Sequence, residues 1–307
     1  MGMNKSIILF TAFLFLISCR RGDEGEAMVI NVLPSVDFGS DFPADREIVF
    51  SAVVGDFSGR TRTLFTEETF RNTGERFWQG TTVWPEHGNL SLLGYSGQGV
   101  ENVRWNEEDP TSSVEMDVPD NSSNQEDILI GCVDDNPRMP WIEMKMQHVF
   151  SLLTFSVQSD IDFDPDLNLG VSISGISIAD VALGGHLTVS REGSGLDVVW
   201  TEVTGSTTRV IDGVSDIRLN SFETANVGVP LLILPSGRKT VTVTYRIHNG
   251  FDGLGRPVNV DIECNVSPQD NWLAGYCTNY LIRITAKELT LTPRIVPWES
   301  VWYNVEL

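Results

Sequence analysis

Met144-Lys-Met-Gln-His148-Val-Phe-Ser-Leu-Leu-Thr-Phe-Ser-Val157 lies near the middle of the chain and decides the expected fold. Its apolar residues fall at every second position up to Leu152 and then continue on the opposite parity from Leu153. A two-residue period with one phase slip predicts a half-buried β-strand that carries a bulge. A short helix from Val149 to Phe155 is the competing interpretation. Because Asn136-Pro137 and Pro140 precede the stretch and break regular structure, we expect it to be the first strand of a second domain.

Short alternating segments dominate the rest of the chain, and no long amphipathic helix is visible. Many short strands separated by turn residues are typical of an all-β sandwich or barrel. We expect residues 20–140 to form one β-domain and residues 141–307 a second, after an address segment at 1–19. The clearest predicted strands are Ala27–Val36, Glu47–Val54, Val171–Ile178, Arg238–Ile247, Val258–Cys264 and Tyr280–Thr285.

The net charge excludes some partners. The chain has 307 residues, with 42 acidic and 21 basic side chains, so its formal net charge is −21. Nucleic acids and anionic membrane surfaces require clusters of lysine and arginine, so neither is expected to bind the folded part. The acidic surface is expected to keep the protein solvated.

The first nineteen residues are typical of an export signal. Lys5 precedes an apolar run from Ile7 to Ile17, which is the length of a signal-peptide core. The run ends in Leu16-Ile-Ser-Cys19, which resembles a bacterial lipobox whose cysteine is acylated. An ordinary signal peptide with a chance cysteine is the alternative. Lipidation of Cys19 would anchor the protein in the outer membrane, exposed at the cell surface.

Several short motifs, each weak alone, follow one another in order along nearly the whole chain. They are the lipobox, Trp84-Pro85, Leu90–Tyr95, Asp127–Ile130, Gln147–Phe155, Ser172–Ile178, Leu232–Pro235, Trp272–Tyr276 with Tyr280, and Pro297-Trp298. In this order they resemble the fimbrillin family of Bacteroidetes, which are lipoprotein pilins and their accessory subunits. Departures are Met146 before the central Gln-His pair and Cys277 where a polar residue is common.

This resemblance implies two transthyretin-like antiparallel β-sandwich domains in tandem and assembly by donor-strand exchange. In the family a protease cuts a loop after the first strand, that strand is lost, and a neighbouring subunit fills the groove. Arg46 is the best candidate for the cut, with Arg60 and Arg62 as alternatives, although each could be a plain surface arginine. The candidate donor strand has Val301, Tyr303, Val305 and Leu307 on one face, although it could be an ordinary last strand.

Chemistry-bearing patterns are sparse. The four histidines are scattered without metal spacing, and no nucleophile elbow or phosphate loop is present, so we expect no enzyme, no cofactor and no metal. His148 is expected to be a buried, hydrogen-bonded strand residue. The acids from Asp160 to Asp166 alternate like a calcium loop but lack its glycine, so a solvated turn is the default and a looser calcium site the alternative. Cys264 and Cys277 either pair across a turn or stay free.

Two functions follow as hypotheses. The first is a structural or adhesive subunit of a cell-surface fimbria, with other fimbrial subunits and a host protein or glycan receptor as partners. The alternative is a monomeric glycan-binding surface lipoprotein, because aromatic side chains stack on sugars. Its candidate platform consists of Trp78, Trp84, Tyr95 and Trp105.

Overall fold

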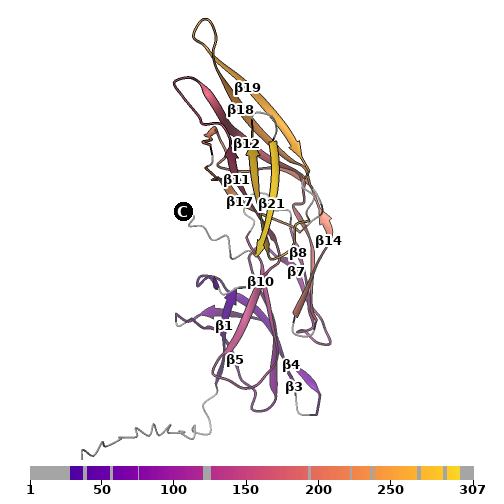
Figure 1. The fold of residues 1–307 in the computed structure, drawn as a ribbon. Helices are drawn as coiled ribbons and strands as arrows, with labels where there is room; N and C mark the ends of the chain where they lie inside the picture. The colour runs from indigo at the N-terminus through magenta and orange to yellow at the C-terminus, as the bar shows by residue number, and fades with distance from the viewer. Residues whose placement is uncertain are drawn as a thin grey trace, which may run out of the picture.

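The computed structural model describes residues 28–36, 40–55, 58–74, 76–119, 126–192, 195–221, 223–235, 237, 239–267, 271–285 and 289–297. These residues form strands and turns without a helix, which confirms the all-β prediction. None of their segments is a helix that could cross a lipid bilayer. Figure 1 shows an elongated molecule, with one β-body at the lower end and a second at the upper end.

The lower body is a closed barrel of seven strands. The strand order closes on itself because the last strand, β10, pairs with both β9 and β1. The interior holds Ile48, Phe50, Phe70, Leu92 and Met144, all fully buried. The strand pattern of the sequence left a sandwich or a barrel open, and this body is a barrel, whose closure leaves its sheet without free edges. The transthyretin-like sandwich implied by the resemblance is not confirmed for it. In barrel order the strands are β10 (Ile142–His148), β9 (Leu129–Asn136), β6 (Asn89–Ser96), β3 (Ile48–Gly55), β4 (Thr61–Asn72), β5 (Trp78–Val83) and β1 (Val29–Val36).

The central stretch is two strands, not one strand with a bulge. β10 ends at His148, and β11 (Ser151–Ser159) starts a different sheet after the buried pair Val149-Phe150. The phase slip in the sequence marks the point where the chain leaves the barrel and enters the upper body. The helical interpretation of residues 149–155 is also wrong, because β11 pairs along its length with β17 (Ala225–Ile233) and β20 (Tyr276–Ile284).

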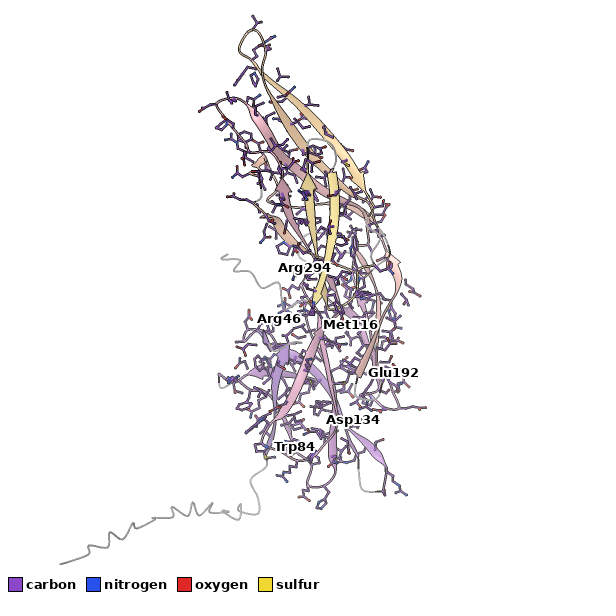
Figure 2. The ribbon with its side chains drawn as sticks, viewed as in Figure 1. Arg46, Trp84, Met116, Asp134, Glu192 and Arg294 are labelled. Carbon is purple, nitrogen blue, oxygen red and sulfur yellow. The ribbon has the colours of Figure 1, made fainter. Side chains whose placement is uncertain are left out.

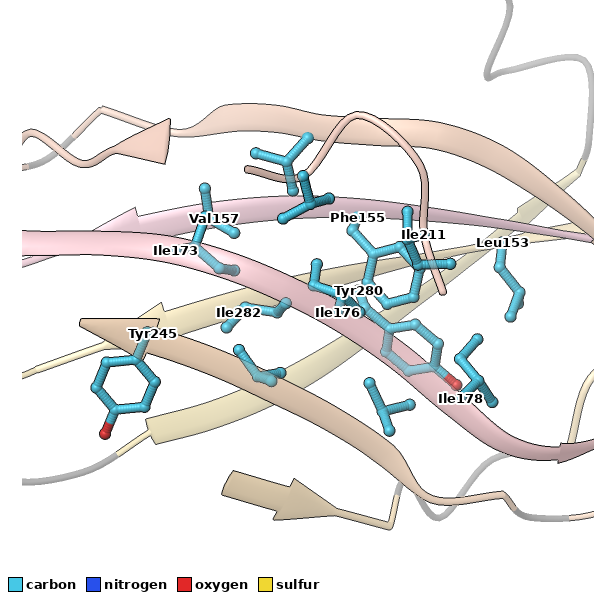
Figure 3. Close-up of a cluster of buried hydrophobic side chains, with 14 of the residues drawn as sticks. Leu153, Phe155, Val157, Ile173, Ile176, Ile178, Ile211, Tyr245, Tyr280 and Ile282 are labelled. Carbon is cyan, nitrogen blue, oxygen red and sulfur yellow. The ribbon is translucent and has the colours of Figure 1, made fainter. Parts of the chain in front are cut away.

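Two sheets face each other in the upper body. One has the order β17-β11-β20-β21, with β21 (Leu289–Pro297) at its edge. Phe155 and Tyr280 stack in the core between the two sheets, with ring centroids 5.7 Å apart (Figure 3). The opposite sheet consists of β12 (Leu169–Val181), β15 (Thr207–Val210), β16 (Ile217–Arg218), β18 (Val241–Phe251) and β19 (Pro257–Val266).

A third sheet covers one outer side of the barrel. It contains β7 (Glu101–Trp105), β8 (Ser113–Val118), β13 (Gly184–Glu192) and β14 (Gly195–Thr204). Leu93 and Tyr95 on the outside of β6 pack with side chains of this sheet, while Leu92 faces the barrel core. β6 is thus covered on both faces, and seven of its eight residues are buried. Since this sheet joins strands from before and after residue 140, the proposed domain division stays a prediction.

Candidate functional site

β1 closes the barrel as the first strand of the described chain. It runs parallel to β10 from Val32↔Ile142 to Val36↔Met146, and antiparallel to β5 with an irregular register. The short β2 (Ser40–Asp41) follows and folds back on its end. Ile30, Val32 and Val36 point into the barrel and are at most 5% exposed. Removing β1 would therefore open a groove between β5 and β10 and leave two unpaired edges.

β5, the strand on one side of this groove, has few ladder contacts with its other neighbour, β4. Only Arg71↔Gln79 and Asn72↔Trp78 are in register. Beyond them, the carboxylate of Glu68 accepts hydrogen bonds from the backbone amides and hydroxyls of Thr81 and Thr82. Burial raises the pKa of Glu68, but these hydrogen bonds outweigh burial and hold its pKa below the ordinary value. Glu68 thus attaches β5 to β4 where the ladder is missing.

Arg46 lies in the segment that joins β2 to β3, at the barrel end nearest the upper body (Figure 2). Its backbone carbonyl accepts a 2.7 Å hydrogen bond from the indole nitrogen of Trp78. Its Nη1 donates to the carbonyl of Asp127 at 2.8 Å, and its amide donates to Pro43. Arg46 is half-buried. This segment must open locally before a protease can hold it in extended form.

Arg60 and Arg62, the alternative cleavage candidates, are exposed at the opposite end of the barrel. Arg60 precedes β4 and Arg62 lies at its start, where Thr61 pairs with Gly55. A cut there would separate β3 from β4 and would not release β1 alone. Arg46 is therefore the only one of the three positions whose cleavage frees β1 and leaves the rest of the barrel continuous.

Polar side chains gather at the barrel end that contains Arg46. Leu129 of β9 lies opposite Ser96 of β6 on one side and opposite His148 of β10 on the other. Because Leu129 belongs to the barrel core, the side chains of Ser96 and His148 also face the barrel interior. His148 is 5% exposed, and its Nδ1 lies 2.6 Å from Oδ2 of Asp127. This confirms the expectation of a buried, hydrogen-bonded histidine. The prediction from sequence did not anticipate this polar mouth, since its members come from separate segments.

The four aromatic residues of the predicted sugar platform do not share a surface. Trp78 and Trp84 are buried inside the barrel, at 3% and 4% exposure. Tyr95 and Trp105 belong to the cluster outside the barrel, with ring centroids 6.2 Å apart. The platform prediction is wrong because strand alternation sends the two pairs to opposite faces of the barrel wall. The glycan-binding alternative thereby loses the observation that motivated it.

The structure also bears on the calcium site and the Cys264–Cys277 disulfide that the sequence left open as alternatives. Asp164 caps its own turn by accepting the amides of Asp166 and Leu167, as expected of a solvated turn. Within the described ranges no group of three or more acidic, histidine or cysteine side chains could hold a metal. Cys264 and Cys277 are both free and lie in different sheets of the upper body.

Two predicted sites lie outside the described residues. Cys19, the lipidation candidate, is one, and the donor strand with Val301, Tyr303, Val305 and Leu307 is the other. The last described strand, β21, pairs with β20 along its whole length and forms an edge of its sheet.

Comparisons with known proteins identify the fold. No protein-family model matches the sequence, and no curated protein matches it either. A fimbrial protein from Bacteroides vulgatus has a TM-score of 0.66 at 12% identity, covering 87% of this chain and 99% of that chain. Putative cell adhesion proteins from Bacteroides uniformis (TM-score 0.53, 16% identity) and Bacteroides ovatus (0.51, 10%) each cover 89% of this chain and are themselves covered over 99% of their length.

The structure thus belongs to the fold class of fimbrial and cell adhesion proteins of Bacteroidetes. The resemblance to fimbrillins that the sequence motifs carried is confirmed at the level of the fold.

Proposed function

We propose that the chain is a structural or adhesive subunit of a cell-surface fimbria, exported as a lipoprotein through Cys19 and assembled by donor-strand exchange. The observation that supports this best is the placement of β1. It is a terminal strand that completes the barrel, and it connects to the next barrel strand through a segment with a single arginine, Arg46. The partners of this subunit are other fimbrial subunits, and a host protein or glycan would bind to the exposed surface of the chain.

The burial of β1 explains why its loss must be coupled to assembly. Three fully buried Val or Ile side chains at about 1.5–3 kcal/mol each give a contribution of roughly 5–9 kcal/mol. A domain's whole stability is only about 5–15 kcal/mol. A barrel without β1 is therefore marginal until another strand fills the groove, and this need drives binding of a donor.

The candidate donor matches the strand it would replace. β1 places Ile30, Val32, Pro34 and Val36 inward at every second position. The segment 301–307 has Val301, Tyr303, Val305 and Leu307 at the same period. An extended strand with this alternation fills successive pockets while its backbone pairs with β5 and β10. We infer that the donor of one subunit enters the groove of the next.

We further propose that the chain divides near residue 140 into an acceptor domain and a transthyretin-like C-terminal sandwich. The facing sheets of the upper body and their shared core around Phe155 and Tyr280 support the second unit. The third sheet, in which β8 pairs with β13, connects the two units.

Incubation of the purified mature protein with an arginine-specific protease tests this function. We expect a cut after Arg46 followed by a ladder of oligomers that resists dissociation. A chain lacking residues 301–307 should be cut equally but form no ladder. Equal ladders from both chains would refute the donor assignment, and a cut at Arg46 without oligomers from the complete chain would refute assembly by strand exchange.

A further inference from the structure

Phe42 fills the mouth of the barrel from the segment that follows β1. It comes directly after β2, is 5% exposed and belongs to the barrel core. Its ring lies edge-on to the indole of Trp78, with ring centroids 5.1 Å apart and an interplanar angle of 87°. Among the described strands β2 pairs only with β1, so Phe42 is held in place by the same segment that contributes β1. This segment therefore supplies the barrel with one large aromatic ring in addition to the inward side chains of β1.

Cleavage after Arg46 would deprive Trp78 of two partners at once. The ring of Phe42 would leave with β1. The carbonyl of Arg46, which accepts a 2.7 Å hydrogen bond from Nε1 of Trp78, would leave with it. Trp78 is 3% exposed in the intact chain and stays behind as the first residue of β5. Uncovered aromatic surface and an unpaired indole N–H are both unfavourable, so a strand that brings a ring and an acceptor is favoured.

The vacancy left by Phe42 lies beside the middle of the groove. Trp78 lies opposite Val32 in the register of β5 and β1. β2, which ends next to Phe42, lies opposite the last two residues of β1. The vacancy thus flanks the places of Val32 and Pro34, two inward residues of β1 that are buried in the intact chain. An inward side chain that is larger than these two would extend from either place into the vacancy.

The candidate donor strand has its one inward aromatic residue at the matching position. Tyr303 is the second of the four inward residues in the segment 301–307. If these four take the four inward places of β1, Tyr303 takes the place of Val32 in one direction of entry. In the other direction it takes the place of Pro34. Its ring therefore lies beside Trp78 whichever way the donor runs.

The size and chemistry of Tyr303 suit the vacancy and not the intact barrel. A tyrosine in place of valine or proline overfills a packed core, so it fits only after Phe42 has left. A buried tyrosine also needs a hydrogen-bond partner for its hydroxyl. Nε1 of Trp78, having lost its carbonyl acceptor, would donate to this hydroxyl. The same pair exists in the upper body, where Nε1 of Trp272 donates to the hydroxyl of Tyr280 at 2.7 Å.

We propose that Trp78 is the recognition residue of the acceptor groove and that Tyr303 of a neighbouring copy takes the place of Phe42 beside it. The inference rests on the proposed function, because only strand exchange brings Tyr303 into the groove. Before cleavage Phe42 is a plug that keeps an aromatic strand out. After cleavage the vacancy selects donors with a tyrosine at this position over donors with small aliphatic side chains.

Phe42→Ala in the uncut mature chain tests the vacancy without any strand exchange. The variant should have a lower unfolding midpoint than the wild type, because it loses a buried ring. p-Cresol, the side-chain analogue of tyrosine, should raise this midpoint along a saturating curve, as for a ligand that binds only the folded state. The control is Phe251→Ala, since Phe251 is 49% exposed and leaves no enclosed space. Absence of a saturating rise, or an equal rise in Phe251→Ala, would overturn the proposal.

A peptide competition in the wild-type chain tests the donor side, and it stands even if Phe42→Ala does not fold. The peptide of residues 298–307 is added during cutting with an arginine-specific protease, and the concentration that halves the oligomer ladder is measured. Tyr303→Val in the peptide should raise this concentration at least about tenfold, because it leaves the vacancy empty. Trp302→Val is the matched control, since this aromatic residue alternates to the opposite face of the strand, and it should change the concentration less than about threefold. Equal effects of the two substitutions would overturn the proposal.

The hydroxyl contact is tested by pairing two conservative substitutions. Tyr303→Phe in the peptide should weaken competition about two- to tenfold against the wild-type chain, as expected for one hydrogen bond. Against Trp78→Phe, which has no indole N–H, the two peptides should compete equally. An unchanged ratio in Trp78→Phe would show that the hydroxyl has another partner and would contradict recognition by Trp78.

The competition also separates this inference from the proposed function. No ladder, or a ladder that the unsubstituted peptide leaves unchanged, would refute donor-strand assembly by residues 301–307. A ladder that the unsubstituted and the Tyr303→Val peptides suppress equally would leave that assembly intact and overturn the role of Trp78 and Tyr303.

Discussion

A covalent bridge between β1 and β10 gives a sharp prediction about strand release. Leu33 and Glu143 lie opposite each other in the parallel pair, and both point away from the barrel core, half-buried and exposed respectively. Neighbouring strands lie about 4.8 Å apart, within the range that a disulfide bridges. Leu33→Cys with Glu143→Cys, in a Cys132→Ser background that prevents mispairing, should therefore form a disulfide.

The magnitude follows from the length of the loop that the bridge closes. A loop of about 110 residues predicts that the bridge stabilises the uncut chain by about 5 kcal/mol in the chain-entropy account. Cleavage after Arg46 opens this loop, and the bridge then acts as a covalent tether. In the oxidised variant a cut after Arg46 leaves β1 attached through the disulfide, so the groove stays filled.

The assay compares oxidised and reduced protein after treatment with an arginine-specific protease. We expect an oligomer ladder only in the reduced sample. The matched control is Thr242→Cys with Asn265→Cys, a paired position on β18 and β19 far from the groove, which should assemble in both states. A ladder from the oxidised Leu33–Glu143 variant equal to that of its reduced form would refute the claim that β1 must leave.

Three further predictions concern stability and reactivity. Glu68→Gln should lower the free energy of unfolding by about 1–2 kcal/mol at pH 7. The difference from wild type should shrink as the pH falls below the ordinary pKa of 4.5 and through the lowered pKa of Glu68, because this carboxylate stabilises the fold only while it is ionised. Urea titrations that show the same difference at every pH would contradict this. Gly94→Ala should lower the free energy of unfolding by about 1–3 kcal/mol, since the added Cβ would lie 2.1 Å from Cδ1 of Phe50. Gly175→Ala is the control and should change stability little, because the nearest atom to its added Cβ lies at 3.8 Å. Equal thermal midpoints for the two variants would count against the packing of Phe50 on Gly94. Burial raises the pKa of the Cys277 thiol to about 11 and shields the thiol from solvent. Iodoacetamide at pH 8 should therefore modify Cys277 only when urea unfolds the protein. Rapid labelling of Cys277 in the native protein would show that the core is open.

Local patterns predicted the strands and failed on how they pair. The alternation of residues 171–178 lies within β12, and that of residues 238–247 overlaps β18, because a half-buried strand imposes a two-residue period. The same period cannot show that β10 pairs with β1, since that contact joins residues about 110 positions apart. It also cannot separate a bulge from a change of sheet, so the pattern alone predicts a bulge where the structure has the end of β10 at His148.

The candidate site was predicted in part for the same reason. Arg46 lies between β2 and β3, where the sequence placed a loop. The direction of Trp78 and Trp84 into the barrel depends on which face of each strand becomes the interior, and closure of the barrel decides that. Ser96 gave no signal by itself. The only indication in the sequence is a polar residue at a strand position whose neighbours two residues away are apolar and buried. This pattern identifies a polar site only once the strand order is known.

The most direct measurement is the intact mass of the protein recovered from the outer surface of the cells that produce it. The account predicts an unlipidated chain that begins at Glu47 and co-purifies with partner subunits. A chain that still begins at lipidated Cys19, retains β1 and elutes alone would contradict donor-strand assembly.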